Sequence, residues 1–320
     1  MAKNYARPLR NDEAIDAFLT NCLGVKKSIV LKNQTTLPKS EVSTRIRDAE
    51  FSVDGVASQT TRKLASCRHA AYRSEDDRVS LREQIVTELC TLPRLDDDEK
   101  ITLGSGGAMP KSGAARAERN AYIVTGLPAS GKSTLVNRIA DDLGAMIVDS
   151  DYAKRKFPEF TGAAGAYLVH DESAMLVEGG EDEDDDEENA PSLMGYCKGK
   201  GLNIVLPKIG HDPKSLNKLL NALTEAGYKV HLTTVVLSRG DATLRAVQRF
   251  IETDRYVPIG RIFDIYANDP ALTYYRFRVE HLNASTGWHS FGALSSENFA
   301  YRMLDCSDES NPAALFREKS

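Results

Sequence analysis

A glycine-rich string in the middle of the chain has the residue types of a phosphate-binding loop. Residues 126–133 read GLPASGKS and match the pattern G-x-x-x-x-G-K-[ST] at Gly126, Gly131, Lys132 and Ser133. The string follows the apolar run AYIVT and precedes apolar residues at helical spacing, so we expect a strand, a loop and a helix. In such a unit, backbone N–H groups and the helix dipole attract phosphate. The string therefore predicts a site for a nucleoside triphosphate.

The side chains of this loop have separate expected roles. Lys132 is expected to bridge the β- and γ-phosphates, Ser133 to bind Mg²⁺, and Thr134 to reach the α-phosphate. The alternative is a strand-to-helix turn that holds no ligand. We predict that the whole loop contacts ATP or GTP, through Gly126, Leu127, Pro128, Ala129, Ser130, Gly131, Lys132, Ser133 and Thr134.

Two carboxylates follow the next predicted strand, residues 145–148. The carboxyl end of a strand in a doubly wound sheet faces the nucleotide, and Asp149 and Asp151 share one face of an extended segment. We predict that Asp151 orients the acceptor hydroxyl and accepts its proton. Asp149 is expected to assist Mg²⁺ or the substrate, and the open alternative is that it caps a helix.

Motifs of other nucleotide-binding proteins are missing. No N-K-x-D string for guanine occurs, and the predicted strands at 202–206 and 230–237 run into Leu-Pro-Lys and Leu-Ser-Arg, without a carboxylate. Both absences count against GTPase switches and ATP-driven motors. The loop and the carboxylates after the second strand favour a kinase.

Apolar runs alternate with helical patterns between residues 119 and 285. This rhythm predicts an α/β P-loop kinase domain with a doubly wound, mainly parallel sheet. Residues 1–118 are expected to form a helical accessory region, with helices near 15–23 and 79–89, that ends in a Gly/Ala/Ser-rich linker at 104–115. Residues 286–320 are expected to be a C-terminal extension. The predicted strands are 121–125, 145–148, 202–206 and 230–237, and the predicted helices are 132–143, 212–226 and 241–252.

The composition of the chain limits the kinds of partner that we expect for it. Its 320 residues include 41 basic and 46 acidic ones, and the acidic run at 181–188 accounts for the net negative charge. We expect the acidic loop, residues 178–190, to be solvated. No clustered basic and aromatic stripe indicates a nucleic-acid partner. No signal peptide or membrane span is recognisable and the five cysteines are dispersed, so we expect a soluble, cytoplasmic protein.

The segment from Gly126 to Phe160 resembles the zeta-toxin family of P-loop kinases. That family has a phosphate loop, then I-D-x-D, then a basic stretch ending in H-P-x-F, and this chain has IVDSD at 147–151 and KFPEF at 156–160. The resemblance covers roughly residues 119–270. It implies that Asp151 is the catalytic base and that two arginines of a lid, Arg249 and Arg255, grip the phosphates. A guanidinium fork suits that task better than the point charge of a lysine.

The resemblance is weaker where the acceptor is recognised. Family members that phosphorylate UDP-N-acetylglucosamine have an E-G-T-G-R-like string after the third strand, whereas residues 207–211 here read PKIGH. That string, with HDES at 170–173, looks more like a branch with bacterial effector kinases that phosphorylate the adenosine ribose of NAD. NAD therefore ranks first as acceptor and UDP-N-acetylglucosamine second. Lys208 is expected to contact a substrate phosphate, and His170 and Glu172 to bind ribose hydroxyls, unless His170 simply begins a helix.

The resemblance also bears on partners. It implies a neutralising antitoxin or a chaperone as a possible protein partner, and delivery into a host cytosol as a possible fate. A different class is a nucleotide-binding interaction protein without turnover. The presence of Lys132 and Asp151 argues against that class.

Overall fold

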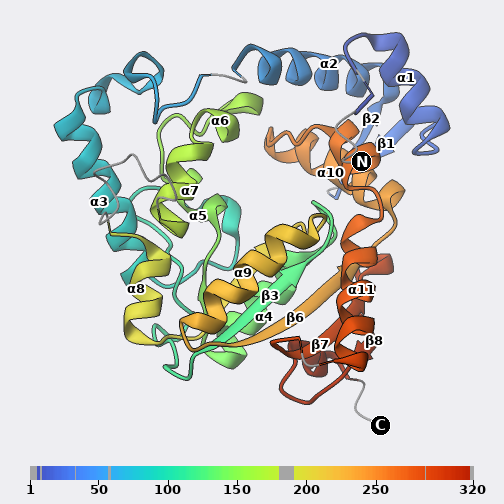
Figure 1. The fold of residues 1–320 in the computed structure, drawn as a ribbon. Helices are drawn as coiled ribbons and strands as arrows, with labels where there is room; N and C mark the ends of the chain where they lie inside the picture. Colours follow the sequence, from blue (N-terminus) through green and yellow to red (C-terminus); the bar gives the residue numbers. More distant parts are fainter. Residues whose placement is uncertain are drawn as a thin grey trace.

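A six-stranded sheet forms the centre of the protein in the computed structural model, which describes residues 6–7, 9–32, 34–56, 59–179, 191–284 and 286–317 (Figure 1). The strand order is β4-β5-β3-β6-β7-β8, and only β8 runs antiparallel to its neighbour. The predicted α/β fold with a mainly parallel sheet is confirmed. The strands are β3 (Asn120–Thr125), β4 (Met146–Ile147), β5 (Ile204–Lys208), β6 (Lys229–Val236), β7 (Trp288–Ser295) and β8 (Arg302–Cys306).

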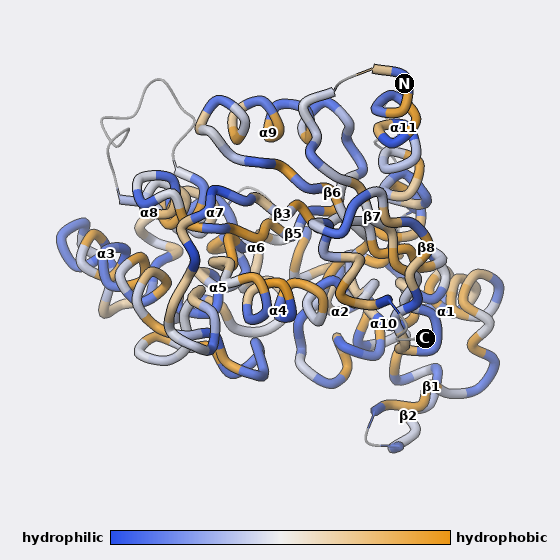
Figure 2. Tube along the Cα trace, turned by 90° about the horizontal axis from the view of Figure 1, so that it is seen from below, coloured by the Kyte–Doolittle hydropathy of each residue, from blue (hydrophilic) through white to orange (hydrophobic). Residues whose placement is uncertain are grey.

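Helices cover both faces of this sheet. The helix α4 (Lys132–Leu143) and the helix α9 (Pro213–Glu225) lie on opposite sides of the strands in both views (Figures 1 and 2). The strands between them are buried over most of their length and are mainly apolar, as expected when neither face meets water. In α4, for example, Leu135, Val136 and Ile139 face the core. The other helices beside the sheet are α8 (Leu193–Lys200), α10 (Arg239–Thr253) and α11 (Asp269–Asn283).

The C-terminal segment differs from the expected extension. Strand β7 pairs in parallel with β6, and β8 pairs with β7, so residues 288–306 complete the sheet. The sequence WHSFGALS conceals this strand because it mixes polar and small residues with apolar ones. Ser290 is buried there because its hydroxyl has partners, His231 at 2.7 Å and Asn311 at 3.0 Å.

The accessory region is helical, as predicted, and also contains a two-stranded hairpin. Helix α1 begins after Asn11, whose side chain accepts a hydrogen bond from the Ala14 N–H at 2.8 Å. The predicted linker is a loop that packs tightly: the Ala108 carbonyl accepts from the Ile147 N–H at 2.8 Å, next to β4. The elements are α1 (Asp12–Asn21), β1 (Ser28–Val30), β2 (Thr36–Pro38), α2 (Lys39–Val56) and α3 (Glu75–Thr91).

This region contacts the sheet domain in two places. Apolar residues of α1 and α2 pack on α10 and the segment after it. Helix α3 packs on α5 (Ser150–Lys154), α7 (His170–Glu178) and α8, at the other side of the molecule (Figure 1). Helix α6 (Gly162–Leu168) lies between these two places and contacts α2. The accessory region is therefore packed on the sheet domain at both of its ends.

A buried ion-pair cluster fixes α3. The guanidinium of Arg78 donates to Glu172 at 2.7 and 2.5 Å and to Glu159 at 2.8 Å, and Arg82 donates to Glu172 at 2.7 Å. Arg78 and Glu172 are fully buried. Burial acts to raise the pKa of Glu172, but its hydrogen bonds and ion pair with Arg78 outweigh this and lower it. The cluster keeps its charges because each one has partners.

Removing one partner should therefore destabilise the protein. We expect Arg78→Met to lower the free energy of unfolding by about 3 kcal/mol, because Glu172 keeps its charge with fewer partners. The matched control is Arg276→Met, since Arg276 forms an exposed pair with Glu280 on α11, and such pairs contribute about 0.5 kcal/mol. Urea unfolding followed by circular dichroism measures both. Equal midpoints for the two variants would contradict the structural role of the cluster.

Two sequence expectations concern other parts of the chain. The acidic run at 181–188 lies outside the described residues, so its solvation stays a prediction. Among the helices that the structure describes, none is both long enough and apolar enough to cross a membrane.

Candidate active site

The predicted phosphate loop connects β3 to α4 at the carboxyl edge of the sheet. Its first and last glycines have positive φ, +148° at Gly126 and +94° at Gly131. A Cβ atom on Gly126 would lie 2.6 Å from the carbonyl oxygen of Val235, so no larger residue fits. These glycines let the loop curl back over the start of α4. Both glycines of the phosphate-loop pattern thus have a backbone conformation that favours glycine.

Lys132 lies across this loop. Its Nζ donates to the carbonyl oxygens of Gly126 and Leu127, each at 2.7 Å. Burial, with the nearby charge of Arg249, lowers the pKa of Lys132 to about 7. Ser133 and Thr134 are exposed on the first turn of α4, where their hydroxyls remain accessible. The loop thus places the residues with the expected roles side by side.

The lowered pKa of Lys132 predicts proton uptake when nucleotide binds. In the free protein the amine is mostly neutral above pH 7, and phosphate charges favour its protonated form. At pH 8 we expect ATP binding to take up close to one proton. At pH 6 Lys132 is already charged, so this uptake should vanish. Calorimetry in buffers of different ionisation enthalpy measures the number, and binding at pH 8 with no uptake would contradict the assignment.

Asp149 and Asp151 follow β4 as predicted. Asp149 caps α5, because its side chain accepts a hydrogen bond from the Asp151 N–H at 2.9 Å. The capping role, the alternative for this residue, is therefore present. Burial and the charge of Asp151 raise the pKa of Asp149 to about 6, so its carboxylate is ionised at neutral pH. A capping oxygen leaves the second carboxylate oxygen for another ligand.

Asp151 lies between two cations. It accepts a hydrogen bond from Lys154 Nζ at 3.0 Å and forms an ion pair with Nη2 of Arg255. Burial opposes ionisation, but Arg255 and Lys154 outweigh it and hold the pKa of Asp151 well below its usual value. The predicted base and one predicted lid arginine are thus in direct contact.

Arg249 is the second predicted lid arginine. Its Nε is buried and has no hydrogen-bond partner within the described part of the chain. Burial and the repulsion of Arg255 lower its pKa to about 10, so the guanidinium is still charged at neutral pH. A buried cation whose donor lacks a partner is costly unless an anion joins it. Arg249 therefore fits a site that receives phosphate.

Glu99 belongs to this site although the sequence analysis did not single it out. It lies in the short turn Asp98–Lys100 of the accessory region. Its Oε1 accepts from Arg155 at 3.0 Å and lies 3.4 Å from Nη1 of Arg255. In sequence Glu99 is one of a run of surface-like charges, LDDDEK, so only the fold identifies it.

The predicted substrate residues have different surroundings. His170 is exposed at the start of α7, and desolvation with the nearby Lys154 charge lowers its pKa. Lys208 ends β5 beside Thr125, and its Nζ pairs with Glu178 at 2.6 Å. Glu172 does not fit its expected role. Its carboxylate is buried against α3, where Arg78, Arg82 and Thr61 occupy both oxygens.

Residues after β7 also hold the loop. The Ser296 hydroxyl donates to the Ser130 carbonyl at 2.6 Å, and the Tyr301 hydroxyl donates to the Gly131 carbonyl. Arg245 in turn donates to the Ser296 carbonyl at 2.9 Å. The sequence contains no motif for these contacts, since they depend on the unrecognised strand β7.

No group of three or more His, Cys, Asp or Glu side chains in the described residues is arranged to hold a metal ion. A Mg²⁺ ion at this site would depend on Ser133, Asp149 and the phosphates of the nucleotide. That arrangement is usual for Mg²⁺, which binds with few protein ligands. The set of hydroxyl and carboxylate oxygens fits the ion.

A loop with the phosphate-loop sequence, a carboxylate after β4 and two arginines are the parts of the site that P-loop kinases have. The family model described as zeta toxin matches residues 110–273, and the chain belongs to the zeta toxin family, whose members are kinase-like phosphotransferases. No curated protein matches the chain.

Solved structures are similar at low sequence identity. One is from the PezAT chromosomal toxin–antitoxin system of Streptococcus pneumoniae, with 14% identity, coverage of 63% of this chain and 77% of that chain, and a TM-score of 0.45. Another is the AvrRxo1-ORF1:AvrRxo1-ORF2 complex with sulphate ions, with 15% identity, coverage of 80% and 75%, and a TM-score of 0.46. The same complex with ATP has 15% identity, coverage of 72% and 67%, and a TM-score of 0.44.

Proposed function

We propose that this protein is a kinase that transfers the γ-phosphate of ATP to a ribose or sugar hydroxyl of a nucleotide metabolite. The single observation that carries the proposal is the contact between Asp151 and Arg255, beside Arg249 and Lys132. One carboxylate and three basic side chains, at the end of a phosphate loop, match the needs of phosphoryl transfer to an alcohol.

Each residue of the site has its own role in the proposed transfer. Residues 126–134 hold the phosphates, and Lys132 contacts the β- and γ-groups. Asp151 orients the acceptor hydroxyl, whose oxygen forms a bond to the γ-phosphorus while the bond to the β–γ bridging oxygen breaks and ADP leaves. Asp151 receives the hydroxyl proton. Its low pKa suits orientation more than strong basicity, as a loose transition state allows.

Arg249 and Arg255 neutralise charge on the transferred group. Mg²⁺, held by Ser133 and Asp149, would shield the phosphate oxygens and polarise the γ-phosphorus. Because α10 and the segment after it contribute both arginines, movement of this segment would expel water around the phosphates. GTP is the alternative donor, since no residue of the described site distinguishes the base.

NAD ranks first as the acceptor and UDP-N-acetylglucosamine second. The support is the string PKIGH at 207–211, which departs from the E-G-T-G-R-like string of the sugar-nucleotide kinases. Lys208 ends its strand next to Thr125, at the start of the phosphate loop, where it can reach a substrate phosphate. His170, close enough to Lys154 to be influenced by its charge, remains a proposed ribose ligand.

The proposal extends to partners and location. Two of the similar structures come from complexes of two proteins, and one from a toxin–antitoxin system, so an antitoxin or chaperone that binds this chain is part of the proposal. We place its action in a cytoplasm, its own or that of a host.

The test is an acceptor screen. The protein is incubated with Mg²⁺ and ATP or GTP, and separately with NAD, UDP-N-acetylglucosamine or a metabolite extract, and products are followed by mass. We expect a mass gain of one phosphate on NAD with wild type, and at most about 1% as much product in the same time with Asp151→Asn. If no compound gains a phosphate, the kinase proposal fails. Nucleotide binding that is equal in both proteins, without turnover, would favour the interaction protein.

A further inference from the structure

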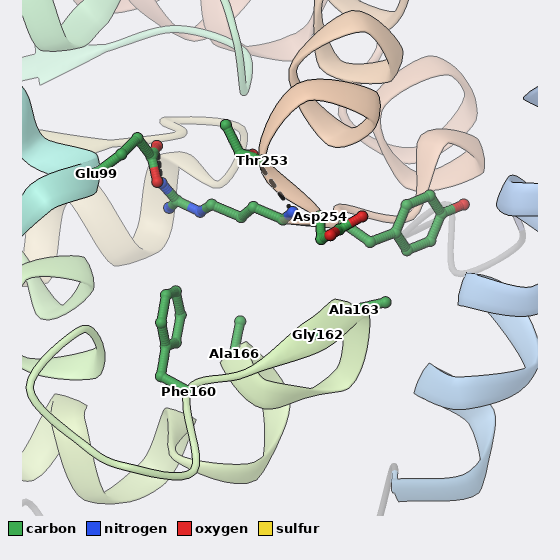
Figure 3. A pocket seen from close by; sticks show the side chains of 9 residues that line it. Glu99, Phe160, Gly162, Ala163, Ala166, Thr253 and Asp254 are labelled. Carbon is green, nitrogen blue, oxygen red and sulfur yellow. Dashed lines mark hydrogen bonds and ion pairs between the residues drawn. The ribbon is translucent and has the colours of Figure 1, made fainter.

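A small pocket lies beside the proposed catalytic centre. It is bounded on one side by residues 253–256 at the end of α10 and on the other by Phe160 and helix α6. In Figure 3 the Phe160 ring and Ala166 point from α6 and the segment before it toward the chain at Thr253 and Asp254, and Glu99 closes one end. We call this site the Phe160 pocket.

The two sides of the Phe160 pocket differ in chemistry. One side is an aromatic ring and the small residues Gly162, Ala163 and Ala166. The other side carries the Glu99 carboxylate, which Arg155 holds at 3.0 Å. A carboxylate fixed in this way accepts hydrogen bonds from hydroxyl groups, and an aromatic face packs against C–H groups. A ligand with hydroxyls on its edge and C–H groups on its face satisfies both sides.

Arg255 connects the pocket to the chemistry. It lines the pocket, and its Nη2 forms the ion pair with Asp151 while Nη1 lies 3.4 Å from Glu99. The guanidinium of Arg255 would therefore lie between a ring in the pocket and the carboxylate of Asp151, the proposed base. A movement of Arg255 away from Asp151 would open the way between a hydroxyl of that ring and the carboxylate.

We infer that the Phe160 pocket binds the hydroxyl-bearing sugar ring of the acceptor, with Glu99 as the residue that accepts hydrogen bonds from its hydroxyls. The inference rests on the proposed kinase function and names its acceptor subsite. Glu99 lies outside the residues matched by the family model, 110–273. The accessory region of this chain thus takes part in choosing the acceptor.

The test fills the pocket from α6. Ala166→Leu adds bulk inside it, whereas Ala164→Leu makes the same change on the same helix at a residue that does not line it. Binding of NAD and of UDP-N-acetylglucosamine is measured by calorimetry, and phosphoryl transfer by mass. We expect Ala166→Leu to weaken the tighter of the two ligands at least tenfold and Ala164→Leu to change it less than twofold, with ATP affinity unchanged in both.

The outcomes separate the two proposals. Unchanged affinity in Ala166→Leu, or no binding of either compound to wild type, overturns the pocket assignment. Phosphate transfer that is indifferent to Ala166→Leu overturns the pocket and leaves the kinase intact. Binding that follows the expected pattern without any transfer overturns the kinase and leaves the pocket. If thermal unfolding shows that Ala166→Leu does not fold, Ala163→Leu replaces it under the same criteria.

Discussion

Asp151→Asn is expected to lower the rate of phosphoryl transfer by about two to four orders of magnitude, the range for loss of a general base. The amide has nearly the shape of the carboxylate but accepts no proton, and it attracts Arg255 and Lys154 less strongly. In the proposed mechanism residues 126–134 hold ATP, so its dissociation constant should change little. Single-turnover transfer and equilibrium ATP binding, measured separately, check the two halves of this expectation.

The control for this variant is Asp142→Asn. Asp142 forms an exposed pair with Arg138 at 3.1 Å on α4, away from the phosphates. Its loss should leave the rate within a factor of two. A transfer rate in Asp151→Asn within tenfold of wild type would show that another group receives the proton, and the assignment of Asp151 would be wrong.

Arg255→Ala is expected to lower kcat by about three orders of magnitude or more, as arginines that stabilise transferring phosphoryl groups do. Arg255→Lys should recover little of this, because one ammonium cannot contact Asp151 and Glu99 together. Steady-state kinetics with the acceptor from the screen give kcat and KM for each variant. Full activity of the lysine variant would contradict the need for a fork.

The pH dependence of the rate in the same variants gives a second, independent test. Arg255 lowers the pKa of Asp151, so its removal should raise that pKa. Since the proposed mechanism requires Asp151 to be ionised, the acidic limb of the pH–rate profile should move to higher pH in Arg255→Ala. Arg276→Ala, on the exposed face of α11, should leave both kcat and this limb unchanged.

Much of the phosphate end of the site was predictable from sequence. The spacing in GLPASGKS demands one backbone geometry, and the structure has positive φ at Gly126 and Gly131 as that geometry requires. Asp151 was predictable because it follows a buried strand at the carboxyl edge of the sheet. Local sequence suffices for these residues, since the strand, loop and helix that place them are contiguous.

The remainder of the site depends on contacts between distant segments. Glu99 meets Arg255 across more than 150 residues, and nothing in LDDDEK distinguishes it from a solvated surface. Glu172 is the opposite case, a residue that the sequence predicted for the site and that the fold places elsewhere. Its position beside His170 suggested a ribose ligand, but the arginines of α3, far away in sequence, take both of its oxygens. Ion-pair partners that are far apart in sequence depend on tertiary packing, so the hydrophobic periodicity of local segments does not predict them.

The same reasoning applies to the fold. Strands β3 and β5 were predictable because they contain continuous apolar runs, as in strands covered on both faces, and β6 because apolar and β-branched residues make up most of it. Strand β7 was missed because it contains polar residues such as Ser290, which is buried and finds its partners in His231 of β6 and Asn311. From the sequence alone, a buried polar residue with a hydrogen-bond partner cannot be distinguished from a polar residue exposed to solvent.

The contacts of Ser296 and Tyr301 with the phosphate loop have a consequence for how the protein matures. Both residues lie near the end of the described chain, whereas the loop they hold lies in its middle. While the chain is being synthesised, β6 is an open edge and the loop lacks this support until β7 is added. The contacts that hold the loop therefore form only after a segment more than 160 residues further along the chain has been made and has paired with β6.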